Sequence, residues 1–445
     1  MFPNRSDGTG GNRPVNNLRG RMAEIRPFRA LHYDPDRVAI ADVTAPPYDV
    51  IDPAGRAGLV ARSDRNVVEL DLPEEAGGDR YEHAAELLAA WREDGVLVQD
   101  EEPTIWAYEQ DYEAPGGGRR TRRGFLARVA VTDYGPGLVR PHERTQPGPK
   151  EDRLRLTRAT GYNMSPIFVL HAGDAWSLLS PALAADPFCE VTDPDGTVHR
   201  AWPIADPAVH GAVAEVVAGS ELLIADGHHR YETARTFAEE VGAAEGDDAR
   251  YTLACLVSLE DPGLSVFATH RLLHDLDETK QLALRDTLMS LFDLEEAGSA
   301  AELVPADGDG TIAFGYMDSF HRKPYRLRLK DDAVLADALP GASEAYRTLD
   351  AAALEALILK GPLGMSTDDI AAKRGLSYCS DFDEAVARVE RGEADAGFFL
   401  RPTPVQQVRD VADAGETMPP KSTYFFPKLL TGIAFNPLGE GRERG

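Results

Sequence analysis

Cysteine is scarce in this sequence, and the three cysteines, Cys189, Cys255 and Cys379, are widely separated. An odd, scattered set fits neither a disulfide framework nor a thiolate zinc cage, so we predict three buried thiols and a reducing compartment, most simply the cytoplasm. No apolar run reaches the roughly 18 residues of a membrane span, so no membrane partner is expected. Residues 1–22 lack the apolar core of a secretory signal and are expected to form a disordered tail.

Basic residues are also in short supply. The 445 residues include 47 lysines and arginines against 74 aspartates and glutamates, a formal net charge of −27. Such a surface repels the phosphate backbones of DNA and RNA, so no nucleic-acid partner is expected. A small phosphorylated ligand is still compatible with this charge, because it needs only a local cationic pocket. These patterns leave the oligomeric state open.

Several catalytic motifs are missing from the chain. It has no Gly-x-Ser-x-Gly elbow, no His-Glu-x-x-His pair and no Gly-x-x-x-x-Gly-Lys-Ser/Thr loop, which argues against the hydrolase, zinc-peptidase and Walker-type sites that these motifs build. Asp226, His228, His229 and His142 are the residues that a transition metal would use. Adjacent histidines on a turn point in different directions, so such a metal site is disfavoured.

The hydrophobic pattern predicts a mixed α+β fold, because strand-like alternation and helical spacing succeed one another along the chain. The expected strands are 66–73, 104–112, 122–134, 166–170, 251–261, 264–273 and a pair near 311–330. The expected helices are 79–94, a segment from about Lys150, and helix-rich stretches at 276–300 and 350–391. A domain boundary is expected near residue 275.

The strongest functional signal is Asp226-Gly227-His228-His229-Arg230, within a predicted strand, glycine turn and helix over 220–240. Gly227 permits close approach of a ligand, and a helix start presents backbone N–H groups and the positive end of the helix dipole. Arg230 offers a fork for phosphate oxygens, the histidines donate or accept hydrogen bonds, and Asp226 is suited to hold Mg²⁺ or to accept a hydroxyl proton. The structural alternative is a capping aspartate with two surface histidines and an ion-paired arginine.

A second polar segment, 142–156, contains a loop rich in proline and glycine. Lys150 is expected near a helix start, where a cation can meet a phosphate. Glu151 or Glu143 is suited to act as general base on a substrate hydroxyl, with Glu151 preferred, and His142 is a candidate for substrate binding. The alternative is a solvated loop followed by a capped helix.

A third segment places Lys421, Ser422 and Thr423 after two prolines. These residues offer one cation and two hydroxyls to a phosphate, provided that the loop folds back beside Arg230. The alternative is an ordinary loop whose following aromatic residues pack into the core.

Two smaller features complete the candidates. Tyr48 and Asp49 follow a rigid Pro-Pro pair and are candidates for substrate binding, although a structural turn is an equally good explanation. His270 and Arg271 end an apolar strand and either border the same pocket or belong to the core.

The segment ADGHHRYETA (225–234) resembles the phosphate-binding signature of the ParB/sulfiredoxin superfamily, and its Asp-Gly-His-His-Arg form is most similar to the free-serine kinases. Together with APPYDVI (45–51), PKEDRL (149–154) and MPPKSTYFFPKL (418–429), it also resembles the prokaryotic family called domain of unknown function 1015. The resemblance implies a ParB/sulfiredoxin-like phosphate- or nucleotide-binding domain with insertions over 23–275 and an α+β domain over 276–445 that completes the cleft.

The function that this resemblance implies is phosphoryl transfer between ADP or ATP and a hydroxyl metabolite such as serine. Asp226, His228, His229 and Glu151 are the expected catalytic residues, with Mg²⁺ held through Asp226. The phosphates are expected on Gly227, His229 and Arg230, with further contacts from Lys150, Lys421, Ser422 and Thr423. Two alternatives use the same pocket: a phosphatase acting on a metabolite such as phosphoserine, and a nucleotide-binding switch without catalysis.

Overall fold

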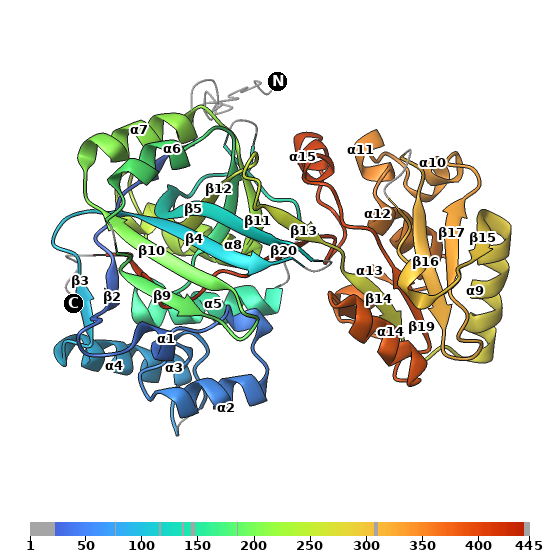
Figure 1. The fold of residues 1–445 in the computed structure, drawn as a ribbon, viewed down its shortest axis with the longest axis horizontal. Coiled ribbons are helices and arrows are strands. Elements are labelled where there is room, and N and C mark those ends of the chain that lie inside the picture. The colour runs from blue at the N-terminus through green and yellow to red at the C-terminus, as the bar shows by residue number, and fades with distance from the viewer. Residues whose placement is uncertain are drawn as a thin grey trace, which may run out of the picture.

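The computed structural model describes residues 23–439, except for 76, 115–116, 136–137, 144–146, 185 and 307–309. The tail predicted for 1–22 lies outside the described residues. Two β-sheets with their helices form two bodies that lie side by side, joined by β13 and β20 (Figure 1). The α+β class predicted from the sequence is confirmed.

The first sheet has nine strands and is mostly antiparallel. In spatial order its main path is β6 (Val139–Arg140), β11 (Leu222–Asp226), β8 (Ile167–His171), β12 (Tyr251–Ser258), β5 (Arg119–Ala130), β4 (Ile105–Glu113), β10 (Val198–Ile204) and β9 (Cys189–Thr192), and β1 (Ile25–Arg26) pairs with β5. Parallel pairing is limited to β6 with β11 and β8 with β12. The strands expected at 104–112 and 122–134 are confirmed as β4 and β5, and they pair with each other as an antiparallel hairpin.

Both faces of this sheet are buried, because alternate residues of its strands enter two different cores. On β12, Leu253 and Cys255 belong to one core, whereas Ala254 and Leu256 belong to the other. The first core is covered by residues of the N-terminal helices and of the C-terminal segment, and the second by residues of α7. The helices of this body are α1 (Ile40–Val43), α2 (Pro53–Arg62), α3 (Val68–Asp71), α4 (Arg80–Glu93), α5 (Pro147–Thr160), α6 (Trp176–Leu179), α7 (Pro207–Ala218) and α8 (His228–Glu240).

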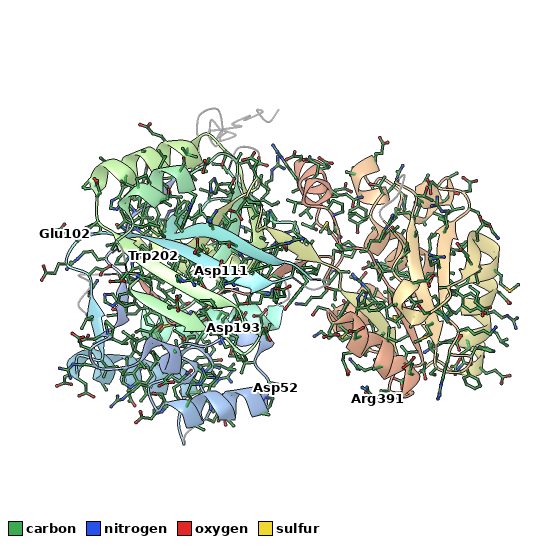
Figure 2. All side chains as sticks on the ribbon, in the orientation of Figure 1. Asp52, Glu102, Asp111, Asp193, Trp202 and Arg391 are labelled. Atoms are coloured by element: carbon green, nitrogen blue, oxygen red, sulfur yellow. The ribbon has the colours of Figure 1, made fainter. Side chains whose placement is uncertain are left out.

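The second sheet has six strands, and all of its pairings are antiparallel. Its order is β15 (Phe292–Glu296), β17 (Tyr325–Leu329), β16 (Ala313–Asp318), β19 (Ala396–Phe399), β14 (His270–Leu273) and β18 (Leu376–Cys379). The longer helices beside it are α9 (Glu278–Leu291) and α14 (Phe382–Glu390); the shorter ones are α10 (Val334–Ala338), α11 (Glu344–Arg347), α12 (Asp350–Leu354) and α13 (Thr367–Ala371). Helix α15 (Val405–Asp413) instead packs its buried residues Val408, Val411 and Ala412 into the first core. In Figure 2, Asp111 marks the first sheet and Arg391 the far end of α14.

The chain passes between the two bodies twice. It leaves the first through β13 (Ser265–Phe267) and returns through β20 (Tyr424–Phe426), which pair with each other. Beyond β20, Phe435 and its neighbours join the first core, and β21 (Asn436–Pro437) pairs with β7 (Tyr162–Asn163). The last small ribbon joins β2 (Leu31–Tyr33) to β3 (Leu97–Gln99). The domain limits stay a prediction, but strand pairing already places β14, which ends before residue 275, in the second sheet.

One predicted strand is wrong. Residues 66–73 contain the short helix α3 instead, because Asn66 is buried and organises the backbone around it. Its side-chain oxygen accepts the N–H of Val68, and its amide donates to the carbonyls of Asp42 and Thr44. Such side-chain bonds compete with strand pairing. The cysteines are unpaired as predicted, and Cys189 and Cys255 are buried, but Cys379 is only half-buried.

Candidate functional site

The turn between β11 and α8 follows the predicted pattern of strand, glycine and helix. Gly227 adopts a left-handed conformation with φ of 89°, and the helix starts at His228. A Cβ at this position would lie 2.9 Å from Cγ2 of Ile167 and 3.1 Å from Nε of Arg230, so only glycine fits without strain. The first N–H groups of a helix have no partner within the helix, and they open towards whatever lies at this turn.

Asp226 forms the ionic centre of the site. One carboxylate oxygen accepts a 2.7 Å bond from Nζ of Lys428, and the other accepts the N–H of Gly227 at 2.7 Å. Burial alone would raise the pKa of Asp226, but the charges of Lys428 and Arg230 outweigh it and hold this pKa far below its usual value. Asp226 is therefore a permanent anion and a poor proton acceptor.

A pocket of about 230 Å³ opens over the turn. Its walls come from both bodies: Tyr48, Asp49, Glu143, Asp226, Gly227, His228, His229, Arg230, Ile370, Ala371, Lys373, Tyr378, Pro420 and Lys421. The turn thus lies beside the Tyr48–Asp49 segment and beside Pro420 and Lys421. These last two residues belong to the segment 418–430, called the returning loop here because it leads back to the first body. The wall built by Ile370, Ala371, Lys373 and Tyr378 was not anticipated.

Tyr48 and Asp49 begin the 3₁₀ turn Tyr48–Val50. The guanidinium carbon of Arg153 lies 4.1 Å from the centre of the Tyr48 ring, which fixes the ring against the wall. Burial raises the pKa of Tyr48 to about 12, so its hydroxyl stays protonated and is a hydrogen-bond donor at neutral pH.

Glu151, the residue preferred as general base, does not lie at the pocket. Its side chain is 61% exposed and pairs with Arg158 at 3.4 Å, and it is not among the residues that line the pocket. Glu143, the second candidate, does line the pocket, next to Pro420 and Lys421. Burial raises the pKa of Glu143 despite the opposing charge of Lys421. Helix α5 explains the difference, because it turns Glu151 away from the pocket.

The residues of the returning loop have divergent roles. Lys421 is exposed, lines the pocket and adopts φ of 58°, a left-handed conformation that is uncommon for residues other than glycine. Ser422 and Thr423 are buried, and their hydroxyls donate to the carbonyl of Pro419 and to Nε2 of His142, respectively. Their predicted contact with phosphate is therefore corrected to an internal role. Lys150 does not line the pocket either, although its charge adds to the effect of burial, which lowers the pKa of His229.

The histidines also divide into internal and pocket-lining groups. His142 is 1% exposed, with Nδ1 donating to the carbonyl of Ile224 at 2.6 Å and Nε2 accepting from Thr423 at 2.8 Å. Burial lowers the pKa of His142 to about 4, so it is neutral and both ring nitrogens are engaged. This corrects its predicted role in substrate binding. Its backbone N–H bonds to Nε2 of His228 at 3.3 Å, which leaves the His228 proton on Nδ1. Burial lowers the pKa values of His228 and His229, and both residues line the pocket.

His270 and Arg271 lie behind the pocket wall. Nδ1 of His270 accepts the N–H of Leu400, as expected of a core histidine. Arg271 is buried, its guanidinium carbon lies 5.4 Å from the centre of the Tyr378 ring, and it donates to the carbonyl of Pro420. It therefore connects two parts of the wall.

No group of three or more metal-ligating side chains gathers among the residues that the structure describes. Asp226, the candidate ligand for Mg²⁺, already binds an ammonium and a backbone N–H. Mg²⁺ is usually held by one or two carboxylates together with substrate phosphates, so Asp226 suits a magnesium ion only with a phosphorylated ligand present.

The main residue that sequence reasoning missed is Lys428. The signal lay in the segment MPPKSTYFFPKL, whose second lysine follows three aromatic residues and a proline and resembles a core-packing stretch. Its partner Asp226 is remote in the sequence, so no local pattern announces the pair.

A family model matches residues 25–352, most of the chain. This protein belongs to the family described as protein of unknown function DUF1015. The match covers the Tyr48–Asp49 segment and the 226–230 turn, which are therefore features of the DUF1015 region, whereas the returning loop lies beyond it. Among proteins with curated descriptions, none matches the chain.

The solved structures to which this chain is similar are remote from it. A conserved hypothetical protein from Pyrococcus furiosus is 17% identical, with 66% of this chain and 90% of that chain covered and a TM-score of 0.34. A free serine kinase variant in complex with ADP is 13% identical, with coverage of 66% and 88% and a TM-score of 0.35. SbnI from Staphylococcus aureus, truncated at its C-terminus, is 11% identical, with coverage of 69% and 87% and a TM-score of 0.34. Identities this low do not carry an activity from one protein to another. Among the described residues, no helix is both long and apolar enough to cross a membrane.

Proposed function

We propose that this protein is a small-molecule phosphotransferase that moves a phosphoryl group between ADP or ATP and a hydroxyl metabolite such as serine. The observation that carries the proposal is one pocket lined by Asp226, Gly227 and Arg230 of the turn, by Lys421, and by two further carboxylates, Asp49 and Glu143. In a protein with a net charge of −27, cations gathered at a helix start favour an anionic ligand. The choice of nucleotide and serine follows the resemblance of Asp226–Arg230 to the free-serine kinases.

The residues divide the work by their charge states. Arg230, Lys421 and the N–H groups at the start of α8 stabilise the phosphates and the charge that develops during transfer. The acceptor hydroxyl oxygen bonds to phosphorus while the bond from phosphorus to the nucleotide's bridging oxygen breaks, and the hydroxyl proton passes to Glu143. Glu143 is the better base because its pKa is raised, whereas that of Asp226 is strongly lowered. Asp226 is the residue that would hold Mg²⁺, and the ion would supply neutralisation of negative charge at the phosphates.

Tyr48, Asp49 and His229 are left to bind the acceptor. The Asp49 carboxylate, which is exposed at the pocket, suits the ammonium group of an amino acid. The neutral His229 ring suits a hydroxyl or a phosphate oxygen as a hydrogen-bond partner.

The size of the pocket favours a second candidate. Its volume of about 230 Å³ is below the range usual for drug-sized ligands, so it holds phosphates and a small acceptor, but the base and ribose of a nucleotide must lie outside it. A phosphorylated metabolite such as phosphoserine would fit entirely. The phosphatase alternative therefore stands beside the kinase.

Phosphorus NMR distinguishes the two candidates. The protein is incubated with Mg²⁺ and either ATP or ADP plus hydroxy amino acids, or with phosphoserine alone. A new phosphoester signal that requires nucleotide supports the kinase, whereas inorganic phosphate released from phosphoserine without nucleotide supports the phosphatase. No turnover in either mixture, with nucleotide still raising the melting temperature, would leave only a nucleotide-binding switch.

The carboxylates supply a matched pair of variants for the same assay. Glu143→Gln is expected to lower the rate roughly 100-fold or more, the usual contribution of a general base. Glu151→Gln is expected to leave the rate unchanged, because its side chain points away from the pocket. The opposite ranking would return the role of base to Glu151.

A further inference from the structure

Arg122 is a buried cation that the proposed chemistry does not use. It lies on β5 and is 1% exposed. The hydrogen bonds that it makes go to neutral groups: Nε donates to the side-chain oxygen of Gln110 at 3.0 Å, and the terminal nitrogens donate to the carbonyls of Phe426 and Pro427 at 3.2 and 2.6 Å. Burying a charge is costly unless it is well satisfied, so this arrangement calls for a reason.

Gln110 holds the next carbonyl along the returning segment, that of Lys428. Because its oxygen accepts from Arg122, its amide nitrogen faces the returning segment and donates to the carbonyl of Lys428 at 2.9 Å. Three successive carbonyls, those of 426, 427 and 428, are thereby held by two side chains of the first sheet. The guanidinium of Arg122 also lies 4.6 Å from the centre of the Phe168 ring, which restricts its plane.

A second buried chain of polar groups secures the residues that follow. The hydroxyl of Tyr108 accepts the N–H of Leu430 at 3.3 Å and donates to Nδ1 of His199 at 2.7 Å. Nε2 of His199 then donates to Asp193 at 3.0 Å. Tyr108 lies on β4 and His199 on β10 of the first sheet, and Asp193, which is labelled in Figure 2, directly follows β9. The backbone of 426–430 therefore rests on a polar surface built into an otherwise apolar core.

We propose that Arg122 and Gln110 are positioning residues, which hold the backbone of 426–428 so that the ammonium of Lys428 meets Asp226 at the pocket. A lysine side chain has several freely rotating bonds. The 2.7 Å contact between Lys428 and Asp226 therefore depends on the position of the Lys428 backbone. Held in this way, Lys428 acts together with Arg230 to keep Asp226 ionised, and Lys421 is left to the ligand. The consequence for catalysis rests on the proposed function, whereas the placement of Lys428 does not.

The placement is tested by amine labelling of the full chain with acetic anhydride, followed residue by residue by mass spectrometry. Arg122→Met removes the contacts at similar volume. Arg56→Met is the matched control, because Arg56 is also buried but bonds to Leu72, Glu69 and Glu74, away from the returning segment. Lys421, which is exposed, is the internal reference.

We expect Lys428 to react roughly tenfold faster in Arg122→Met, within the coupling range of residues that share one network, and at the wild-type rate in Arg56→Met. An unchanged rate for Lys428 in folded Arg122→Met would overturn the proposal. If Arg122→Met does not fold, Gln110→Met, which frees the Lys428 carbonyl, decides by the same two outcomes.

Calorimetric titration with ADP separates this proposal from the proposed function. Arg122→Met is expected to lower the affinity for ADP roughly tenfold. The double variant Arg122→Met, Lys428→Met should bind ADP as weakly as Lys428→Met alone, because both changes act through one group. Fully additive losses would contradict the positioning role. If the wild-type protein binds no ADP, the nucleotide hypothesis fails, while the labelling rates still judge the placement of Lys428.

Discussion

The two segments that build the pocket are held in different ways. The Asp226–Arg230 turn is shaped mainly by its own residues, since a strand end, a left-handed glycine and a helix start follow one another without interruption. The segment 418–430 depends on groups from elsewhere in the chain: His142, Arg122 and Gln110 bind its side chains or carbonyls. The first segment is therefore a local motif, and the second is a tertiary one.

The two lysines of the returning segment make the contrast concrete. Lys421 is exposed at the pocket, whereas Lys428 is largely buried and bonds to Asp226. The residue type is the same and the positions are close in sequence, yet one lysine can meet a ligand and the other neutralises a partner. What a charged side chain does is decided by what surrounds it.

The largest expected effect on stability comes from removing the ammonium of Lys428. Lys428→Met should lower the free energy of unfolding by about 3 kcal/mol, because Asp226 would be left as a poorly compensated buried charge. Urea denaturation at neutral pH measures the loss. Adding Asp226→Asn should recover part of it, and a single variant as stable as the wild type would show that the pair contributes little.

Acidification tests the contact between the strand that leads into the 226–230 turn and the segment 418–430. His142 connects the two, because it bonds to both Ile224 and Thr423. Its folded-state pKa, about 4, lies below the unfolded value of about 6.5, so the unfolded state binds the proton more tightly. The stabilisation is present above pH 6.5 and is lost as the pH falls towards 4. We expect stability to drop by about 2 kcal/mol between pH 7 and pH 5 from this group alone. Urea titrations of wild type and His142→Gln check this, and equal pH slopes in the two proteins would contradict it.

A substitution at the glycine tests the local character of the turn. Gly227→Ala should cost about 1–2 kcal/mol and weaken nucleotide binding, because a Cβ meets Ile167 and Arg230 at a left-handed φ. Gly242→Ala is the control, since Gly242 has φ of 60° but nothing within 4 Å of an added Cβ. Both variants are compared by thermal unfolding and by ADP titration. A loss of affinity in Gly242→Ala as large as that in Gly227→Ala would argue against a special role for the turn.

The smallest effect on stability is expected at the exposed lysine. Lys421→Met should change the free energy of unfolding by less than about 0.5 kcal/mol, as is usual for surface positions. The same variant should nevertheless bind phosphate or ADP measurably more weakly in calorimetry, although its stability is nearly unchanged. If Lys421→Met destabilises the protein as much as Lys428→Met, the distinction between the two lysines is wrong.

Local signals predicted a good part of this molecule. The hairpin of β4 and β5, helix α4 and the turn at Gly227 follow from alternation, helical spacing and a single glycine, all of which act between neighbours. Other predictions were wrong because burial and contacts beyond the local pattern decide the outcome. Buried Asn66, which bonds to Asp42 and Thr44, turns a strand-like stretch into α3. Helix α5 points Glu151 outward, and His142 takes the hydroxyl of Thr423.

The sequence by itself determined the α+β class, the family and the strand, glycine and helix of the 226–230 turn, because each rests on residues that are adjacent or regularly spaced. Only the tertiary structure decided which groups share the pocket. It placed Glu143 there instead of Glu151, separated Lys421 from Lys428, and added Tyr378 from the second sheet. These choices depend on contacts between segments up to hundreds of residues apart, and no local pattern encodes such contacts, because they arise only when the chain is packed.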